Sequence, residues 1–128
     1  MHEPGREVDA LAHAVIGAAI DVHRALGPGY LEAVYEAALH VELEERGIGF
    51  ERQKAVPVLY KDRIIATHRL DFLVGAQLIV ELKAVEVVVP VHFAQMISYL
   101  TATHLTLGLL INFQVPLLKQ GIHRVVRS

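Results

Sequence analysis

The chain has 128 residues, of which 53% are hydrophobic and 20% charged, and its formal net charge is −2. It contains no cysteine, which excludes disulfides, thiolate metal sites and cysteine nucleophiles and fits a reducing cytoplasm. Because no basic run stands out, a strong non-specific nucleic-acid binder is disfavoured, and any nucleic-acid contact must be local or assisted by a metal ion. The size predicts one domain over residues 1–128. The high apolar content indicates either strands buried on both faces or a homodimer interface.

Two helices are expected first. Residues 1–6 are predicted to fray and carry no secretory signal, and no run is long enough to span a membrane. Apolar residues at helical spacing predict a helix from Asp9 to Leu26, ended by Gly27-Pro28-Gly29. A second helix is expected from about Tyr30 to Arg46. Its buried side is expected to carry Leu31, Val34, Ala38 and Val41, with Leu39 and Leu43 as further candidates.

The hydrophobic period then changes to the alternation that is typical of strands. Strands are predicted over Phe50–Tyr60, Ile64–Val74 and Leu78–Ala84. The connecting segments 61–63 and 75–77 are short, so the three strands should form an antiparallel meander.

The last part of the chain returns to a helix and then to strands. The pattern predicts a helix over His92–Thr103, with Pro90 suited to a first turn. Leu105–Phe113 is nearly continuous in apolar residues, as in a buried central strand, and His123–Arg127 is expected to be a short strand. The order α-α-β-β-β-α-β-β predicts an α+β fold, with a mixed sheet flanked by helices.

The hairpin centred on residues 75–77 brings two carboxylates together. Counting outward from the turn places Asp71 opposite Glu81, and Arg69 opposite Lys83. The other face then carries three apolar pairs, Val74–Leu78, Phe72–Val80 and Leu70–Leu82.

Like charges placed opposite each other are destabilising unless a proton, a cationic side chain or a divalent ion offsets them. Two interpretations stay open: a surface cluster of ion pairs with Arg69 and Lys83, or a metal site in a partly covered cleft. Apolar Ile79, on the same face as Glu81, favours the cleft.

Mg²⁺ prefers oxygen ligands and keeps several waters. Asp71 and Glu81 with one backbone carbonyl, that of Leu82, would bind Mg²⁺ or Mn²⁺. Lys83 would orient or deprotonate a water, or stabilise charge on a phosphate. None of the eight His residues forms an H-x-x-x-H pair, so a histidine metal site is disfavoured.

The segment Gly29–Tyr35 has the form G-x-x-E-x-x-Y and is flanked by Ile16–Ile20 and Leu26–Gly29. It resembles the GxxExxY protein family, grouped with the PD-(D/E)XK nuclease superfamily, and the resemblance covers about residues 10–127. It implies a restriction-endonuclease-like core.

The resemblance also implies roles for site residues. Asp71 and Glu81 would bind the metal, and Lys83 of the Glu81-Leu82-Lys83 motif would assist catalysis; Leu70 rather than proline precedes Asp71. Glu32 would be the additional helix acid, and Glu32 and Tyr35 share a helix face that could reach the cleft.

Gln95 and Tyr99 resemble the Q-x-x-x-Y motif of the RecB-like branch of that superfamily. The residues alone leave simpler roles open. Glu32 could be a first-turn acid favoured by the helix dipole, and Gln95 and Tyr99 could only tie the helix to the sheet.

Three hypotheses follow. The first is a Mg²⁺-dependent cytoplasmic phosphodiesterase acting on nucleic acid, DNA before RNA. The second is a catalytically silent nucleic-acid-binding or regulatory module on the same scaffold. The third is a structural homodimer with a surface ion-pair cluster.

Overall fold

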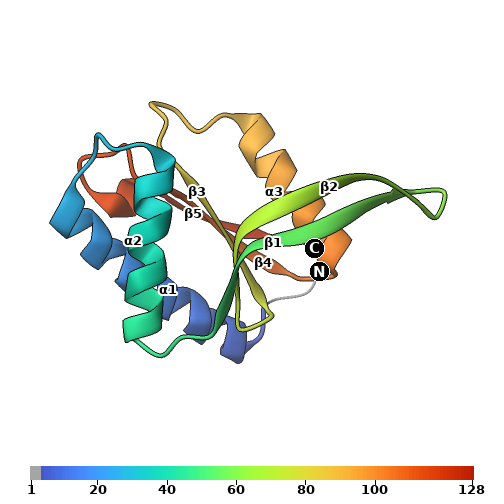
Figure 1. The fold of residues 1–128 in the computed structure, drawn as a ribbon, viewed down its shortest axis with the longest axis horizontal. Helices are drawn as coiled ribbons and strands as arrows, with labels where there is room; N and C mark the ends of the chain where they lie inside the picture. Colours follow the sequence, from blue (N-terminus) through green and yellow to red (C-terminus); the bar gives the residue numbers. More distant parts are fainter. Residues whose placement is uncertain (1–3) are drawn as a thin grey trace.

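The computed structural model describes residues 4–128, and its elements follow the predicted order (Figure 1). The fold is α+β, as predicted, with a five-stranded mixed sheet and three α-helices in the described residues. The elements are α1 (Arg6–Leu26), α2 (Glu32–Glu45), β1 (Phe50–Tyr60), β2 (Arg63–Val74), β3 (Leu78–Lys83), α3 (Pro90–Thr103), β4 (Leu107–Asn112), the 3-10 helix η1 (Leu118–Gly121) and β5 (Ile122–Val126).

The sheet has the strand order β1-β2-β3-β4-β5 and is covered on both faces. Only β3 and β4 pair in parallel, and α3 makes the crossover between them. Helices α1 and α2 pack together on one face over one hydrophobic cluster, and α3 packs on the other face over a second cluster. Burial on both faces accounts for the apolar sequences of β3 and β4, as the first explanation of the composition expected.

Glycine ends the first two helices, as expected. Gly27 follows α1 with a φ of 69°, and its N–H donates to the His23 carbonyl. Gly47 follows the end of α2 with a φ of 68°. Both φ values lie in the left-handed region, which glycine adopts without steric cost.

The ends of some elements differ from the prediction. Helix α1 begins at Arg6 rather than Asp9, and Pro4 is buried, so fraying is wrong for residues 4–6; residues 1–3 lie outside the described part of the chain. Helix α2 begins at Glu32, and η1 was not expected. The described helices include none that is both long and apolar enough to cross a membrane.

The buried side of α2 is only partly the predicted one. Leu39 and Leu43 are buried and Ala38 packs against the core, but Leu31 is 80% exposed, Val41 52% and Val34 39%. Tyr35 and Glu36 are buried instead. Apolar residues lie almost all round this helix, so their spacing does not decide which side faces the core.

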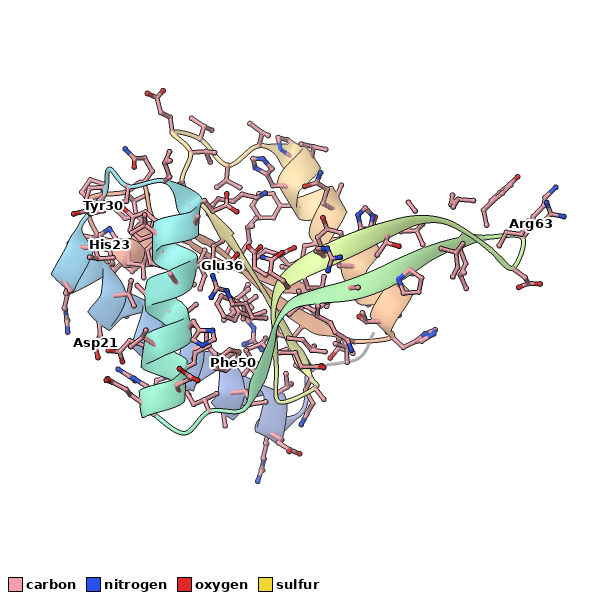
Figure 2. All side chains as sticks on the ribbon, viewed as in Figure 1. Asp21, His23, Tyr30, Glu36, Phe50 and Arg63 are labelled. Atoms are coloured by element: carbon pink, nitrogen blue, oxygen red, sulfur yellow. The ribbon has the colours of Figure 1, made fainter. Side chains whose placement is uncertain are left out.

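The hairpin of β1 and β2 extends away from the rest of the molecule (Figures 1 and 2), with Arg63 near its tip. Every residue from Leu59 to Thr67 is exposed. The exposed side chains include four large hydrophobic ones, Leu59, Tyr60, Ile64 and Ile65.

The base of this hairpin departs from regular alternation. Strands β2 and β3 pair as predicted through Phe72↔Val80 and Val74↔Leu78, and the pairing ends there. The predicted pair of Leu70 with Leu82 is wrong, because Leu70 packs in the cluster under α3 and Leu82 in the cluster under α1 and α2.

Strand β1 changes faces at the same level. Phe50 packs against the cluster under α1 and α2, whereas Val56 belongs to the cluster under α3. In a regular strand, residues separated by an even number share one face. Both strands therefore switch faces between these positions, where Gln53 and Asp71 lie across from each other.

Candidate active site

Asp71 and Glu81 meet at the point where β2 and β3 separate. The Asp71 N–H donates to Glu81 Oε2 at 2.8 Å, and the Leu82 N–H donates to Asp71 Oδ2 at 2.8 Å. Each carboxylate thus bonds the backbone of the opposite strand, where the regular ladder has ended. The predicted cross-strand placement of the two acids is what the structure has.

The environment of the pair disfavours two negative charges. Burial and the neighbouring Asp71 raise the pKa of Glu81 to about 9, and Glu81 is only 8% exposed. Burial also raises the pKa of Asp71. Lys83 lowers the pKa of Glu81, but it is the smallest of the named influences.

The alternative of a surface ion-pair cluster does not fit this geometry. In residues 4–128, neither Arg69 nor Lys83 forms a salt bridge with Asp71 or Glu81. Arg69 instead donates from Nη1 to the Gln53 carbonyl at 3.5 Å. The repulsion between the carboxylates is left for a proton or a bound cation to offset.

Helix α2 contributes two more acids. Glu32 is half-buried, and burial and Asp71 raise its pKa. Glu36 lies one turn later and is buried (Figure 2), with its carboxylate bonded to Arg52 and Gln53 of β1. Because Glu36 already has these two donors, Glu32 is the better placed of the two to act on a substrate or water.

Helix α3 covers the other side of Glu81. The carboxylate lies in a narrow crevice of about 10 Å³, room for no more than a water molecule. Burial, followed by Glu81 and Asp71, raises the pKa of Tyr99. The crevice is lined by Glu81, Lys83, His92, Gln95, Met96, Tyr99 and Leu110.

The structure therefore gathers the six predicted catalytic residues around one site. Glu81, Lys83, Gln95 and Tyr99 line the crevice, and Asp71 is hydrogen-bonded to Glu81. Glu32 lies close enough to Asp71 and Lys83 for their charges to act on its pKa. Arg69, predicted as a cationic partner of the carboxylates, bonds the Gln53 carbonyl instead.

Tyr35 is the second such case, and its predicted place at the cleft is wrong. Its ring is fully buried and stacks on Phe113 with centroids 4.5 Å apart. Its hydroxyl donates to the Gly27 carbonyl at 2.6 Å and accepts the Tyr30 N–H at 3.2 Å. Tyr35 thus fixes the connection between α1 and α2, directly before Glu32.

Sequence reasoning missed Glu36 and Gln53. The available signal for Glu36 was an acid within the apolar stretch Tyr35–Leu39, where a charge needs a buried partner. Nothing in the sequence indicated the left-handed conformation of Gln53, whose φ is 55° in the middle of β1.

The donors present fit a hard divalent cation. The described residues contain no group of three or more His, Asp or Glu side chains suited to a metal, so side chains alone would supply two ligands, Asp71 and Glu81. In an extended strand the N–H and C=O of one residue point to the same edge. Since the Leu82 N–H points at Asp71, its carbonyl faces the same gap. Mg²⁺ accepts one or two carboxylates and completes its shell with water and phosphate.

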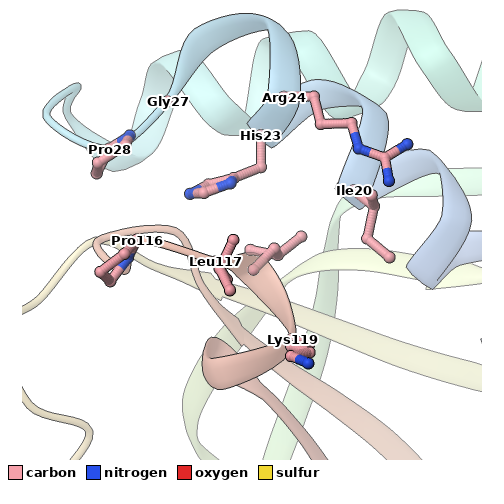
Figure 3. A pocket seen from close by; sticks show the side chains of 9 residues that line it. Ile20, His23, Arg24, Gly27, Pro28, Pro116, Leu117 and Lys119 are labelled. Carbon is pink, nitrogen blue, oxygen red and sulfur yellow. The ribbon is translucent and has the colours of Figure 1, made fainter.

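A roomier cavity lies elsewhere, between α1 and η1 (Figure 3), with a volume of about 530 Å³. Its charged lining residues are Arg24 and Lys119, and it contains no carboxylate to hold a metal. The residues that line it are Ile20, His23, Arg24, Gly27, Pro28, Pro116, Leu117, Leu118 and Lys119. This cavity is therefore not suited to a metal-dependent site.

A mixed sheet that carries two carboxylates on adjacent strands, with a lysine two residues after the second, defines a nuclease-type fold. A family model described as the PD-(D/E)XK nuclease superfamily matches residues 9–125, and the chain belongs to this superfamily. The predicted superfamily and its core are thereby confirmed. Nucleases of this superfamily generally use divalent metals such as Mg²⁺. No curated protein and no solved structure matches the chain.

Proposed function

We propose that the protein hydrolyses phosphodiester bonds of nucleic acid, DNA before RNA, with Mg²⁺ or Mn²⁺ bound by Asp71, Glu81 and the Leu82 carbonyl. The observation that carries the proposal is the carboxylate pair of buried Glu81 and half-buried Asp71, which is fixed by backbone hydrogen bonds and forms no salt bridge with a cationic side chain in residues 4–128. The superfamily supports the substrate class.

The remaining side chains have distinct tasks. When bound, the metal polarises the phosphoryl oxygen and lowers the pKa of water. The half-buried ammonium of Lys83 stabilises negative charge that develops on the phosphate. Glu32, on the Asp71 side, accepts a hydrogen bond from the attacking water, and Gln95 and Tyr99 donate hydrogen bonds from α3.

Cleavage assays test the proposal. Plasmid, single-stranded DNA and RNA are incubated with Mg²⁺, Mn²⁺ or EDTA. Asp71→Asn keeps an acceptor for the Leu82 N–H but removes the charge, and we expect it to lower the rate by about 10²-fold. Lys119→Ala, in the distant cavity, is the control and should cleave like the wild type. Equal rates for the Asp71 variant and the wild type, or cleavage in EDTA, would refute a metal-dependent site.

The narrow crevice and the net charge of −2 favour a second candidate, a catalytically silent nucleic-acid-binding or regulatory module. Calorimetry with Mg²⁺, Mn²⁺ and short oligonucleotides separates the two. Binding of oligonucleotide without turnover by the wild type supports the silent module.

The finer assignments belong to the same proposal. The segment Gly29–Tyr35 supports membership of the GxxExxY proteins within the superfamily. Residues 1–128 would then form one nuclease-like domain acting in the cytoplasm.

A further inference from the structure

We propose that Glu36 is a positioning residue. Glu36 holds Gln53 of β1 in a left-handed conformation. This conformation makes the β1–β2 hairpin switch faces at its base, which orients Asp71 toward Glu81 and Leu82. The inference deepens the proposed function and rests on it for the Mn²⁺ affinity measurement only.

Glu36 is held at both carboxylate oxygens. Arg52 Nε donates to Oε2 at 2.7 Å, and Gln53 Nε2 donates to Oε1 at 2.8 Å. The Glu36 side chain is buried in α2, whose position is fixed by the packing of Leu39 and Leu43. Because a buried carboxylate needs its donors, the two β1 side chains are bound to a rigid point.

Two consecutive strand residues thus reach the same helix. In a regular strand, neighbouring side chains point to opposite faces, so Arg52 and Gln53 could not both contact Glu36. The φ of 55° at Gln53 removes this restriction. Residues other than glycine rarely adopt a positive φ, and they keep it only where the surrounding structure holds them in it. Glu36 holds the Gln53 side chain, and Arg69 Nη1 donates to its carbonyl.

The consequence for the site lies one strand away. Asp71 is across from Gln53, between the pairs Arg52↔Phe72 and Lys54↔Leu70. At this level the hairpin switches faces and β2 stops pairing with β3. The Asp71 N–H is thereby released to Glu81 Oε2, and its carboxylate can accept the Leu82 N–H.

Glu36 acts on Asp71 through its charge as well as through geometry. Both of its oxygens accept hydrogen bonds from β1, which hold the carboxylate in place. After burial, the Glu36 carboxylate also contributes to the raised pKa of Asp71. The test must therefore separate positioning from this charge and from the contribution of one buried ion pair to stability, and the Gln53 variants below leave the charge unchanged.

The test compares Glu36→Ala with Glu42→Ala, which removes another α2 carboxylate paired with an arginine, Arg46. Amide hydrogen exchange is measured in EDTA. For Glu36→Ala we expect exchange at the Asp71 and Leu82 amides to accelerate about tenfold relative to the Leu109 amide, because their bonds open locally. Mn²⁺ affinity, by calorimetry, should fall about tenfold. Glu42→Ala should change neither.

Gln53 supplies a second pair of variants in case Glu36→Ala fails to fold. Both Gln53→Gly and Gln53→Ala lose the amide, but only glycine adopts a positive φ without steric cost. Gln53→Gly should therefore lie closer to the wild type in Mn²⁺ affinity than Gln53→Ala.

Two results would overturn the inference: equal local exchange and Mn²⁺ affinity in Glu36→Ala and Glu42→Ala, or equal affinity in the two Gln53 variants. A wild type that cleaves nothing, with exchange at Asp71 and Leu82 still dependent on Glu36, would remove the proposed function and leave the positioning role intact.

Discussion

The hydrogen bonds of Asp71 and Glu81 tie the chemistry of single residues to the stability of the fold. Their carboxylates replace the main-chain pairing that β2 and β3 lack beyond Phe72↔Val80. A site that joins two strands through its own ligands must respond to pH and metal through its stability as well as its activity.

The first prediction concerns Glu81 and pH. Its pKa rises from 4.5 to about 9 on folding. Between these values the unfolded chain has released a proton that the folded protein keeps, so in EDTA the stability present at low pH is lost as pH rises. We expect Tm to fall between pH 5 and 9 in the wild type. Glu81→Gln cannot ionise and should show a flatter profile. Parallel Tm profiles for the two proteins would contradict the shift.

The second prediction concerns Lys83. The loss of one group that stabilises charge on the phosphate typically lowers kcat by about 10²–10³-fold. We expect Lys83→Ala to show this loss with an unchanged Tm, because Lys83 makes no salt bridge within residues 4–128. Steady-state kinetics and thermal unfolding check it, with Lys119→Ala as the matched lysine variant. A fall in Tm without a fall in kcat would assign Lys83 a structural role.

At the scale of elements, the G-x-x-E-x-x-Y motif at the start of α2 contributes two residues with different roles. Tyr35 points into the core and bonds the Gly27 carbonyl, whereas Glu32 faces Asp71 and Lys83. One turn of helix thus anchors the α1–α2 connection and presents an acid to the site.

The third prediction separates these tasks. Tyr35→Phe leaves the Gly27 carbonyl without its donor and should lower the free energy of unfolding by about 1–3 kcal/mol. Mn²⁺ affinity should change little. Glu32→Gln should do the reverse, with normal stability and slower cleavage. Denaturant unfolding, calorimetry with Mn²⁺ and cleavage kinetics on both variants provide the check; identical profiles would show that the motif acts as one unit.

The elements themselves were largely predictable, because glycine and proline mark their ends and the hydrophobic period marks their type. Gly27 and Gly47 ended two helices, and the 75–77 turn set the register that placed Asp71 near Glu81. These signals are local, so a single sequence contains them.

What failed depends on contacts between distant parts of the chain. The buried face of α2 depends on a contact with Phe113, which stacks on Tyr35 although the two residues lie far apart in sequence. The face switch at Gln53 depends on Glu36 in another element. Alternation counted along one hairpin cannot contain either contact, and it therefore misplaced Leu70.

At the scale of the whole molecule, the sheet is unevenly protected. Strands β3 and β4 lie between two hydrophobic clusters and are almost wholly buried. The hairpin from Leu59 to Thr67 is exposed on both faces.

The fourth prediction is the order of amide exchange. Local opening is least costly where few apolar contacts are lost, so peptides spanning 57–67 should exchange first and those of β3 and β4 last. Hydrogen–deuterium exchange by mass spectrometry measures this order. Slow exchange in 57–67 would mean that the four exposed hydrophobic side chains there are covered in solution, as a homodimer would do.

The crossed hydrogen bonds of the carboxylate pair also limit which substitutions related proteins could tolerate at Asp71 and Glu81. A lineage that abandoned catalysis would still need acceptors for the Asp71 and Leu82 amides to keep β2 and β3 fastened. Amide side chains meet that demand, so Asp71→Asn and Glu81→Gln should be the exchanges that such silent descendants tolerate, and apolar residues at these places should be rare among them.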